Sequence, residues 1–173
     1  GMDLLSRHQR VTIFTTGFLT PMFQKMVAED YDKHKYCFRI HGNSQTMVGE
    51  MLALYDSLQE DYGFDKVAIM VQDVAHARAG GEIMNEQLQE RGWSVTGPRV
   101  YPTGTLDYSD GLFRARDFGA QVLFIWMDMP ESSVLMRQWY DMELPALPIG
   151  FICAAEQPDF WDATEGKGEY TIA

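Results

Sequence analysis

Continuous apolar runs alternate along this chain with stretches in which apolar positions recur at helical spacing. Lys66–Val71 and Gln121–Met127 are almost entirely apolar, which is typical of parallel strands covered on both faces. A run interrupted by Gly97-Pro98 predicts a strand near a sheet edge, because proline has no backbone N–H to donate to a neighbouring strand on each side. The remaining strands are predicted from their apolar, β-branched and aromatic composition. They are Val11–Phe14, Tyr36–Ile40, Val95–Tyr101, which is the weaker one, and Pro148–Ile152, which is the last strong one.

Helices are predicted between these strands. The clearest covers Met47–Tyr62, where apolar residues recur at helical spacing and Gly63 follows at a capping position. Others are predicted to begin at Thr20-Pro21 and Pro130-Glu131, and one is predicted to end near Arg91. Regular alternation of strand and helix predicts an α/β protein whose parallel sheet has helices on both faces.

Size and charge restrict the class of protein. The chain has 173 residues, of which 46% are hydrophobic, enough for a globular domain with a core. Its net charge of -11 argues against a nucleic-acid partner, since binding to phosphates needs a basic patch. Its apolar runs are too short to span a bilayer. The two cysteines, Cys37 and Cys153, are expected to be buried thiols rather than a bridge or a zinc site.

The expected sheet also predicts where a ligand would bind. In open parallel sheets, ligands lie beyond the carboxyl ends of the strands, where the strand order reverses. Four segments therefore merit attention: His41–Thr46, Asp73–Gly81, Trp126–Met129 and Phe151–Glu156. They contain three carboxylates that could reach one crevice, although each is also an ordinary loop residue.

Few catalytic or metal-binding motifs survive inspection. Gly80-Gly81 lacks the spacing of a phosphate loop, and the four histidines lack metal-ligand spacing, so neither a metal site nor a cofactor is expected. Ser44 lies between a strand and a helix, as in a nucleophile elbow, but Thr46 replaces the final glycine of that motif. An esterase using Ser44 is therefore kept only as a weak alternative. In the other interpretation, Asn43, Ser44 or Thr46 caps the following helix.

Several segments, in order and at suitable spacing, resemble those of type I periplasmic binding proteins in the branched-chain amino-acid receptor branch of ABC transport. The resemblance is carried by Tyr36–Arg39, Lys66–Ile69 with Asp73 and Ala77–Ala79, Asp107–Ser109, Phe118–Ala120, Leu135–Gln138 and Pro148–Gly150. It implies a three-layer α/β/α lobe of the Rossmann or flavodoxin-like kind. It also implies that 1–41 is a remnant of the first lobe plus a hinge strand, and that 42–173 is the second lobe. The chain would then hold a truncated form of a two-lobed fold.

The resemblance also implies ligand contacts and a function without catalysis. The expected ligand-binding residues are Thr16, Phe18, Asp73, His76, Trp126, Asp128 and Phe151. Ile152 stands where amino-acid receptors have an acid, which weakens the case for an α-amino acid. The expected ligand is an amino acid, an amide or an aromatic acid. From the residues alone, Trp126 and Phe151 could equally be sheet core, and His76 and Asp128 could be solvated.

The implied partners are an ABC permease or a sensor, and the implied location is periplasmic or extracellular. A second hypothesis is a stand-alone oligomeric interaction module that binds no solute. The strand Val11–Phe14 would lack its sheet neighbours in a truncated lobe, and open apolar strands pair readily. We therefore expect a homodimer through the N-terminal strand and helix.

Overall fold

The structure is a computed structural model that describes residues 2–15 and 20–173. The chain divides into two compact units, unit 1 (Gly1–Glu50) and unit 2 (Met51–Ala173). The helix α4 (Ser44–Tyr62) begins in the first unit and ends in the second. Each unit is described by itself below.

Unit 1 is built around a two-stranded parallel sheet, in which Ile13 lies opposite Phe38. One face of this sheet packs on a small core that contains Met2, Phe23 and Cys37. The predicted strands are confirmed in shorter form. The elements are α1 (Met2–Arg7), β1 (Thr12–Phe14), α2 (Met22–Glu29), α3 (Tyr31–His34) and β2 (Cys37–Arg39).

The start of α4 is set by a side-chain cap. The side chain of Asn43 accepts a hydrogen bond from the backbone N–H of Thr46 at 2.9 Å, so it satisfies one of the donors that a helix start leaves open. The capping interpretation of this segment is thereby confirmed, and α4 begins three residues before the predicted Met47.

Unit 2 contains a four-stranded sheet in the order β4-β3-β5-β6, and every neighbouring pair is parallel. The predicted α/β class is confirmed. The elements after α4 are β3 (Lys66–Gln72), α5 (Ala75–Glu90), β4 (Ser94–Tyr101), α6 (Ser109–Phe118), β5 (Val122–Met127), α7 (Ser132–Asp141), β6 (Leu147–Ile152), a 3-10 turn (Cys153–Glu156) and α8 (Phe160–Ala163).

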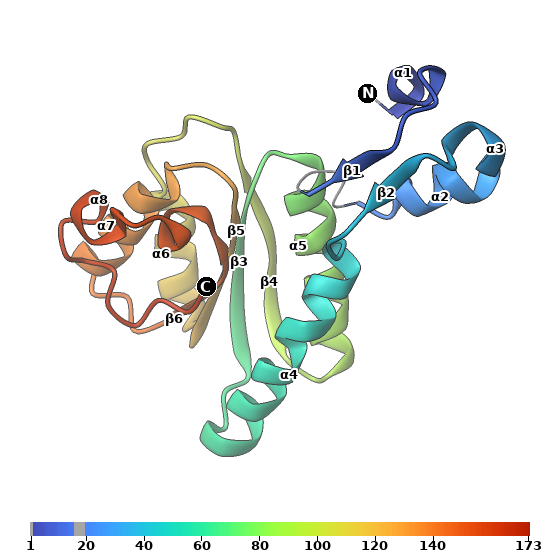
Figure 1. The fold of residues 1–173 in the computed structure, drawn as a ribbon. Helices are drawn as coiled ribbons and strands as arrows, with labels where there is room; N and C mark the ends of the chain where they lie inside the picture. The colour runs from blue at the N-terminus through green and yellow to red at the C-terminus, as the bar shows by residue number, and fades with distance from the viewer. Residues whose placement is uncertain (1, 16–19) are drawn as a thin grey trace. The chain divides into compact units, whose positions relative to one another are not determined.

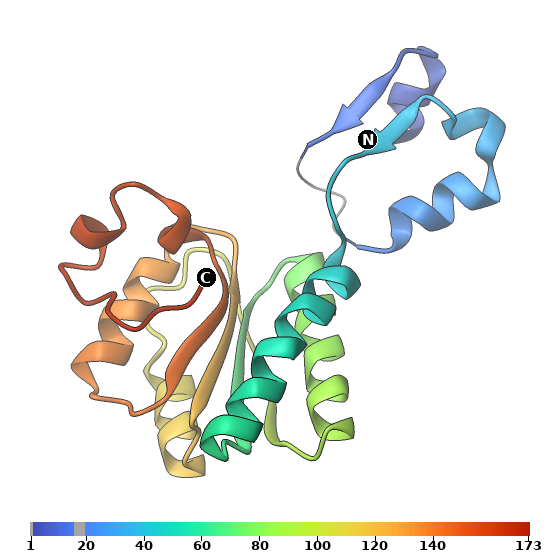
Figure 2. The same ribbon diagram turned by 60° about the horizontal axis from the view of Figure 1, so that its bottom comes forward.

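Helices cover both faces of this sheet (Figures 1 and 2). Because side chains alternate along a strand, β5 sends Leu123, Ile125 and Met127 into a core shared with α6 and α7. Its other face carries Trp126, which packs against α5. Residues of β5 are no more than 1% exposed, as the uninterrupted apolar run predicts.

The edges of the sheet follow the sequence signals. The edge strand β4 contains Gly97-Pro98, and its register with β3 shifts between Ala68 and Met70. At the other edge, Ile172 forms an isolated parallel bridge to Ile149 of β6. The end of the chain is therefore held against the sheet. Within the described ranges, no helix combines the length and the apolar character needed to cross a membrane.

Candidate functional site

Strand order places one point of reversal in unit 2. The chain passes from β3 outward to β4 on one side, then returns to β5 on the other side of β3. The carboxyl ends of β3 and β5, at the top of the sheet in Figure 1, are therefore the position at which open parallel sheets bind ligands.

Two predicted residues meet at this point. His76 lies in the first turn of α5, which follows β3, and Asp128 directly follows β5. His76 Nε2 and Asp128 Oδ2 are 2.5 Å apart, and the two side chains are 22% and 15% exposed. The pair is thus partly buried and reachable from the carboxyl-end face of the sheet.

Backbone contacts hold the loops that carry this pair. The buried side chain of Gln72, at the end of β3, accepts a hydrogen bond from the backbone N–H of Asp128 at 2.9 Å. The backbone N–H of Asp73 donates to the carbonyl oxygen of Tyr101, at the end of β4, at 2.7 Å. These bonds tie three neighbouring strand ends together, so His76 and Asp128 stand on a rigid base.

An aromatic cluster lies beneath the pair. The Trp126 ring centroid is 6.2 Å from that of His76, in an edge-to-face arrangement, and 6.0 Å from that of Phe151. Trp126 is 0% exposed, so in this structure it supports the site from within the sheet. Gly80 of α5 leaves the space that the indole fills, since a β-carbon there would lie 2.2 Å from the ring.

Two buried polar atoms at this cluster have no hydrogen-bond partner among the residues that the structure describes. They are Asp128 Oδ1 and Trp126 Nε1. A buried polar atom left unpaired costs on the order of 1–3 kcal/mol, so such atoms attract a donor or an acceptor from outside the protein. The Asp128 oxygen can accept from a hydroxyl, amide or ammonium group, and the indole N–H can donate.

Other predicted residues take different places. Asp73 lies at the same strand ends but pairs with Arg78, its Oδ1 2.6 Å from the guanidinium Nε, and both side chains are substantially exposed. Ile152 is fully buried, so it is part of the core. Thr16 and Phe18 lie outside the described residues.

Cys153 follows β6 at the same end of the sheet. Burial, and then the carboxylate of Glu156, raises the pKa of its thiol above the ordinary value. A raised pKa keeps the thiol protonated at neutral pH, which is the opposite of what a cysteine nucleophile needs.

Ser44 is 0% exposed at the start of α4. A nucleophile must meet its substrate, so the burial of this hydroxyl argues against the esterase alternative.

The sequence predicts that His76 and Asp128 lie at one end of the sheet. It does not predict that the two side chains pair, or that the Gln72 side chain holds the loop that carries Asp128. The useful signal was that both residues follow directly after buried strands.

Solved structures similar to this chain are solute-binding proteins of ABC transporters. A protein from Silicibacter pomeroyi, described as a branched-chain amino acid ABC transporter, is 17% identical with a TM-score of 0.78, over 96% of this chain and 43% of that one. A solute-binding protein from R. palustris, in complex with 4-hydroxybenzoate, is 17% identical with a TM-score of 0.74, over 94% and 42%. A leucine-binding protein from Thermotoga maritima is 16% identical with a TM-score of 0.68, over 79% and 38%.

No protein-family model and no curated protein matches the sequence. The chain spans less than half the length of each of these three structures. At this level of identity the likeness concerns the fold. The expected resemblance is confirmed in that sense: the fold of this chain is similar to that of part of a type I periplasmic binding protein, amounting to most of one lobe.

Proposed function

We propose that unit 2 binds a small solute over the carboxyl ends of β3 and β5, and that the chain serves as the receptor part of an ABC-type uptake system outside the cytoplasm. The observation that carries the proposal is the His76–Asp128 pair at the point where the strand order reverses. The solute-binding proteins that share the fold add support. Further support comes from Ser44 and Cys153, because the burial of the Ser44 hydroxyl and the raised pKa of the Cys153 thiol make both residues poor nucleophiles.

The chemistry of the pair favours an aromatic acid or amide that also carries a hydrogen-bond donor. Asp128 Oδ1 requires a donor, His76 can face an anionic or acceptor group, and the partly exposed ring of Phe151, which Trp126 supports from within the sheet, suits a flat ligand. An α-amino acid is less favoured, because Ile152 supplies no charge for its ammonium group. The R. palustris protein in complex with 4-hydroxybenzoate has a ligand of the favoured kind.

Titration of the ¹⁵N-labelled chain with 4-hydroxybenzoate, leucine and glutamine tests the proposal. We expect 4-hydroxybenzoate to shift the amide resonances of His76 and Asp128 and their neighbours. The Asp128→Asn variant should weaken binding at least about tenfold, since hydrogen bonds to a charged group contribute roughly 1.5–3 kcal/mol.

Asp110→Asn is the matched control, because Asp110 is also a carboxylate paired with a basic side chain, Arg99. It should leave the affinity unchanged. Equal weakening by both variants, or no shift at the β3 and β5 ends with any of the three solutes, would contradict the proposal. Contacts from Thr16 and Phe18 stay predictions.

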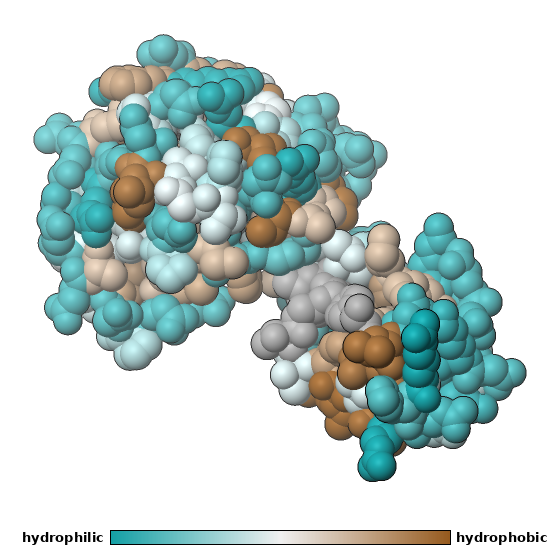
Figure 3. Space-filling view, turned by 90° about the horizontal axis from the view of Figure 1, so that it is seen from above, coloured by the Kyte–Doolittle hydropathy of each residue, from teal (hydrophilic) through white to brown (hydrophobic). Residues whose placement is uncertain are grey.

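A second candidate function, self-association through unit 1, is favoured by its surface. Ile13 and Phe38 lie opposite each other in register and are 55% and 50% exposed. Val11 and Ile40 flank them and are also exposed, and Figure 3 shows hydrophobic side chains gathered on this unit. A contiguous apolar face of this kind is typical of an interface.

We propose that a second copy of the chain covers this face. Light scattering should give the mass of a dimer, and the double variant Ile13→Ser with Phe38→Ser should give a monomer. Leu106→Ser removes an even more exposed apolar side chain from unit 2 and should leave the dimer intact. A monomeric mass for the unaltered chain would refute this second function.

A further inference from the structure

A second region of unit 2 has the features of a binding site. A pocket of about 350 Å³ lies at the C-terminal end of α7, lined by Trp139, Tyr140, Asp141, Glu143, Leu144 and Tyr170. A more apolar pocket of about 310 Å³ shares Trp139, Leu144 and Tyr170 with it and extends along Leu147 at the start of β6. Volumes of this size suit small molecules. Because β6 starts here, this region lies at the opposite end of the strands from His76 and Asp128.

Three aromatic side chains line the first pocket. Trp139 is held in place because its indole N–H donates to the carbonyl oxygen of Ala146 at 2.8 Å, and it is only 7% exposed. Tyr140 packs edge-to-face on it, with ring centroids 6.3 Å apart. Tyr170 is 69% exposed and borders both pockets.

The backbone at this pocket adopts an uncommon conformation at two positions. Tyr170 has a φ of 66° and Glu143 a φ of 48°, in the left-handed region that bulky residues rarely occupy. Tyr170 is held there because the nearby Ile172 exchanges two backbone hydrogen bonds of 3.0 Å with Pro148 and Gly150 of β6. Such strain recurs at functional sites.

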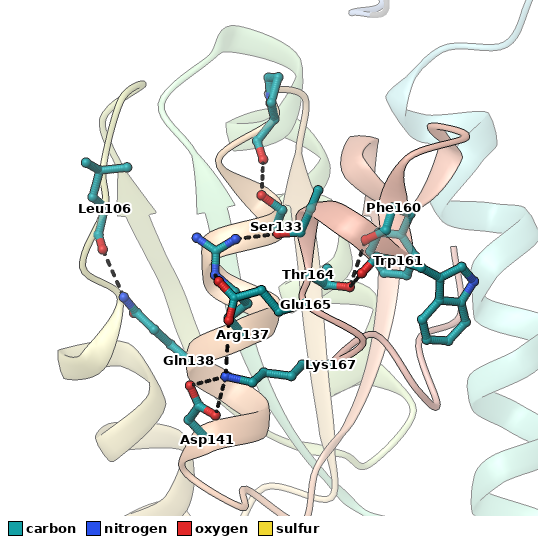
Figure 4. A network of polar contacts seen from close by, with 12 residues as sticks. Leu106, Ser133, Arg137, Gln138, Asp141, Phe160, Trp161, Thr164, Glu165 and Lys167 are labelled. Atoms are coloured by element: carbon teal, nitrogen blue, oxygen red, sulfur yellow. Dashed lines mark hydrogen bonds and ion pairs between the residues drawn. The ribbon is translucent and has the colours of Figure 1, made fainter.

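The charge of the pocket is negative. Asp141 already holds a cation of the chain itself, since Lys167 Nζ lies 2.9 Å from its Oδ1 and 3.7 Å from Glu165 (Figure 4). Glu143 has no ion pair within the described part of the chain. The pocket also adjoins the C-terminal end of α7, where the helix dipole favours positive charge.

We propose that this pocket binds a small organic cation, a quaternary or alkyl ammonium group. Aromatic faces around a carboxylate are the environment that such cations prefer, because the ring quadrupole attracts them and they are weakly hydrated. Glu143 supplies the charge, Trp139 and Tyr170 supply the faces, and the second pocket accepts an apolar extension of the same ligand. The site is separate from the solute site at the other end of the strands and does not depend on it.

Choline is a suitable probe, and 3,3-dimethyl-1-butanol is its neutral analogue of the same shape. In ¹H–¹⁵N spectra of the chain, choline should shift the indole resonance of Trp139 and the amide resonance of Tyr170 with millimolar affinity. The neutral alcohol should bind at least about threefold more weakly, since it lacks the charge that cation–π contacts need. Equal affinity for both probes would refute recognition of a cation.

Two variants and a matched control locate the site. Glu143→Gln and Tyr170→Gly should each weaken choline binding about twofold to fivefold, the range expected for one exposed charge or cation–π contact. Tyr170→Gly also suits the left-handed backbone, so it should fold normally. Glu86→Gln removes the same charge from the exposed face of α5 and should have no effect. Weakening by Glu86→Gln equal to that by Glu143→Gln, or no shift of Trp139 with choline, would overturn the proposal.

Discussion

Gly80 offers a sharp test of how the candidate site is built. The residue lies within α5, where alanine is favoured over glycine by about 1 kcal/mol through helix propensity alone. At this position, however, a β-carbon would lie 2.2, 2.4 and 2.8 Å from three carbons of the Trp126 ring, where ordinary carbon contacts are about 3.5–4.0 Å. We therefore predict that Gly80→Ala destabilises the protein.

The expected magnitude follows from two opposing terms. Overpacking a core costs about 1–3 kcal/mol, and the upper end applies here because the ring must move by about 1 Å or more. Trp126 is fully buried, with the rings of Phe124 and Phe151 about 6 Å away, so little room exists for that movement. Subtracting the gain in helix propensity leaves a net loss of about 2 kcal/mol.

Gly49→Ala is the matched control. Gly49 lies in α4, and a β-carbon added there would meet nothing within 4 Å, so only the propensity gain of about 1 kcal/mol remains. Urea unfolding followed by tryptophan fluorescence and circular dichroism should place the two variants on opposite sides of the unaltered chain. In thermal unfolding, each 1 kcal/mol corresponds to roughly 2–4 °C at this size. A Gly80→Ala variant as stable as the unaltered chain would refute the packing argument.

Asn43→Ala should destabilise the protein by about 1 kcal/mol, because it removes the cap that accepts from the N–H of Thr46, and thermal unfolding against the exposed Ser57→Ala would measure this. A midpoint equal to that of the Ser57 variant would contradict it. For Cys153, burial raises the thiol pKa, so at pH 8 the folded chain holds less thiolate than a free cysteine would. Alkylation of Cys153 should therefore be slower in the folded chain than in the chain unfolded in urea. Both rates would be measured in a Cys37→Ser background, in which Cys153 is the remaining thiol. Faster alkylation in the folded chain would show that reasoning to be wrong.

The sequence predicted most of the fold because burial leaves a strong pattern. The continuous apolar run that ends at Met127 identified a strand covered on both faces, and Gly97-Pro98 identified the edge strand. The apolar periodicity predicts a start of α4 at Met47, three residues after the observed Ser44, because it does not detect the local hydrogen bond by which Asn43 caps the helix.

The candidate site could be predicted only in part. His76 and Asp128 could be placed at the same end of the sheet, since each follows a strand. Their pairing, and the burial of Trp126 behind Gly80, depend on side-chain directions across two strands and a helix, which no local pattern carries. The sequence does not predict the aromatic pocket at the other end of the strands. Tyr170 lines this pocket near Ile172, which pairs with Ile149 of β6, and this long-range pairing leaves no local pattern.

At the point where the strand order reverses, residues inside β3 and β5 and residues just after these strands are under different evolutionary constraints. Residues inside those strands must fit both helical layers at once, so few substitutions there keep the fold. His76 and Asp128 come after the strands end and are partly exposed, so the two layers constrain their side chains less. On the proposed function, a lineage could therefore change the bound solute by altering a few strand-end positions, and a protein engineer seeking a biosensor could diversify those positions without first restabilising the scaffold.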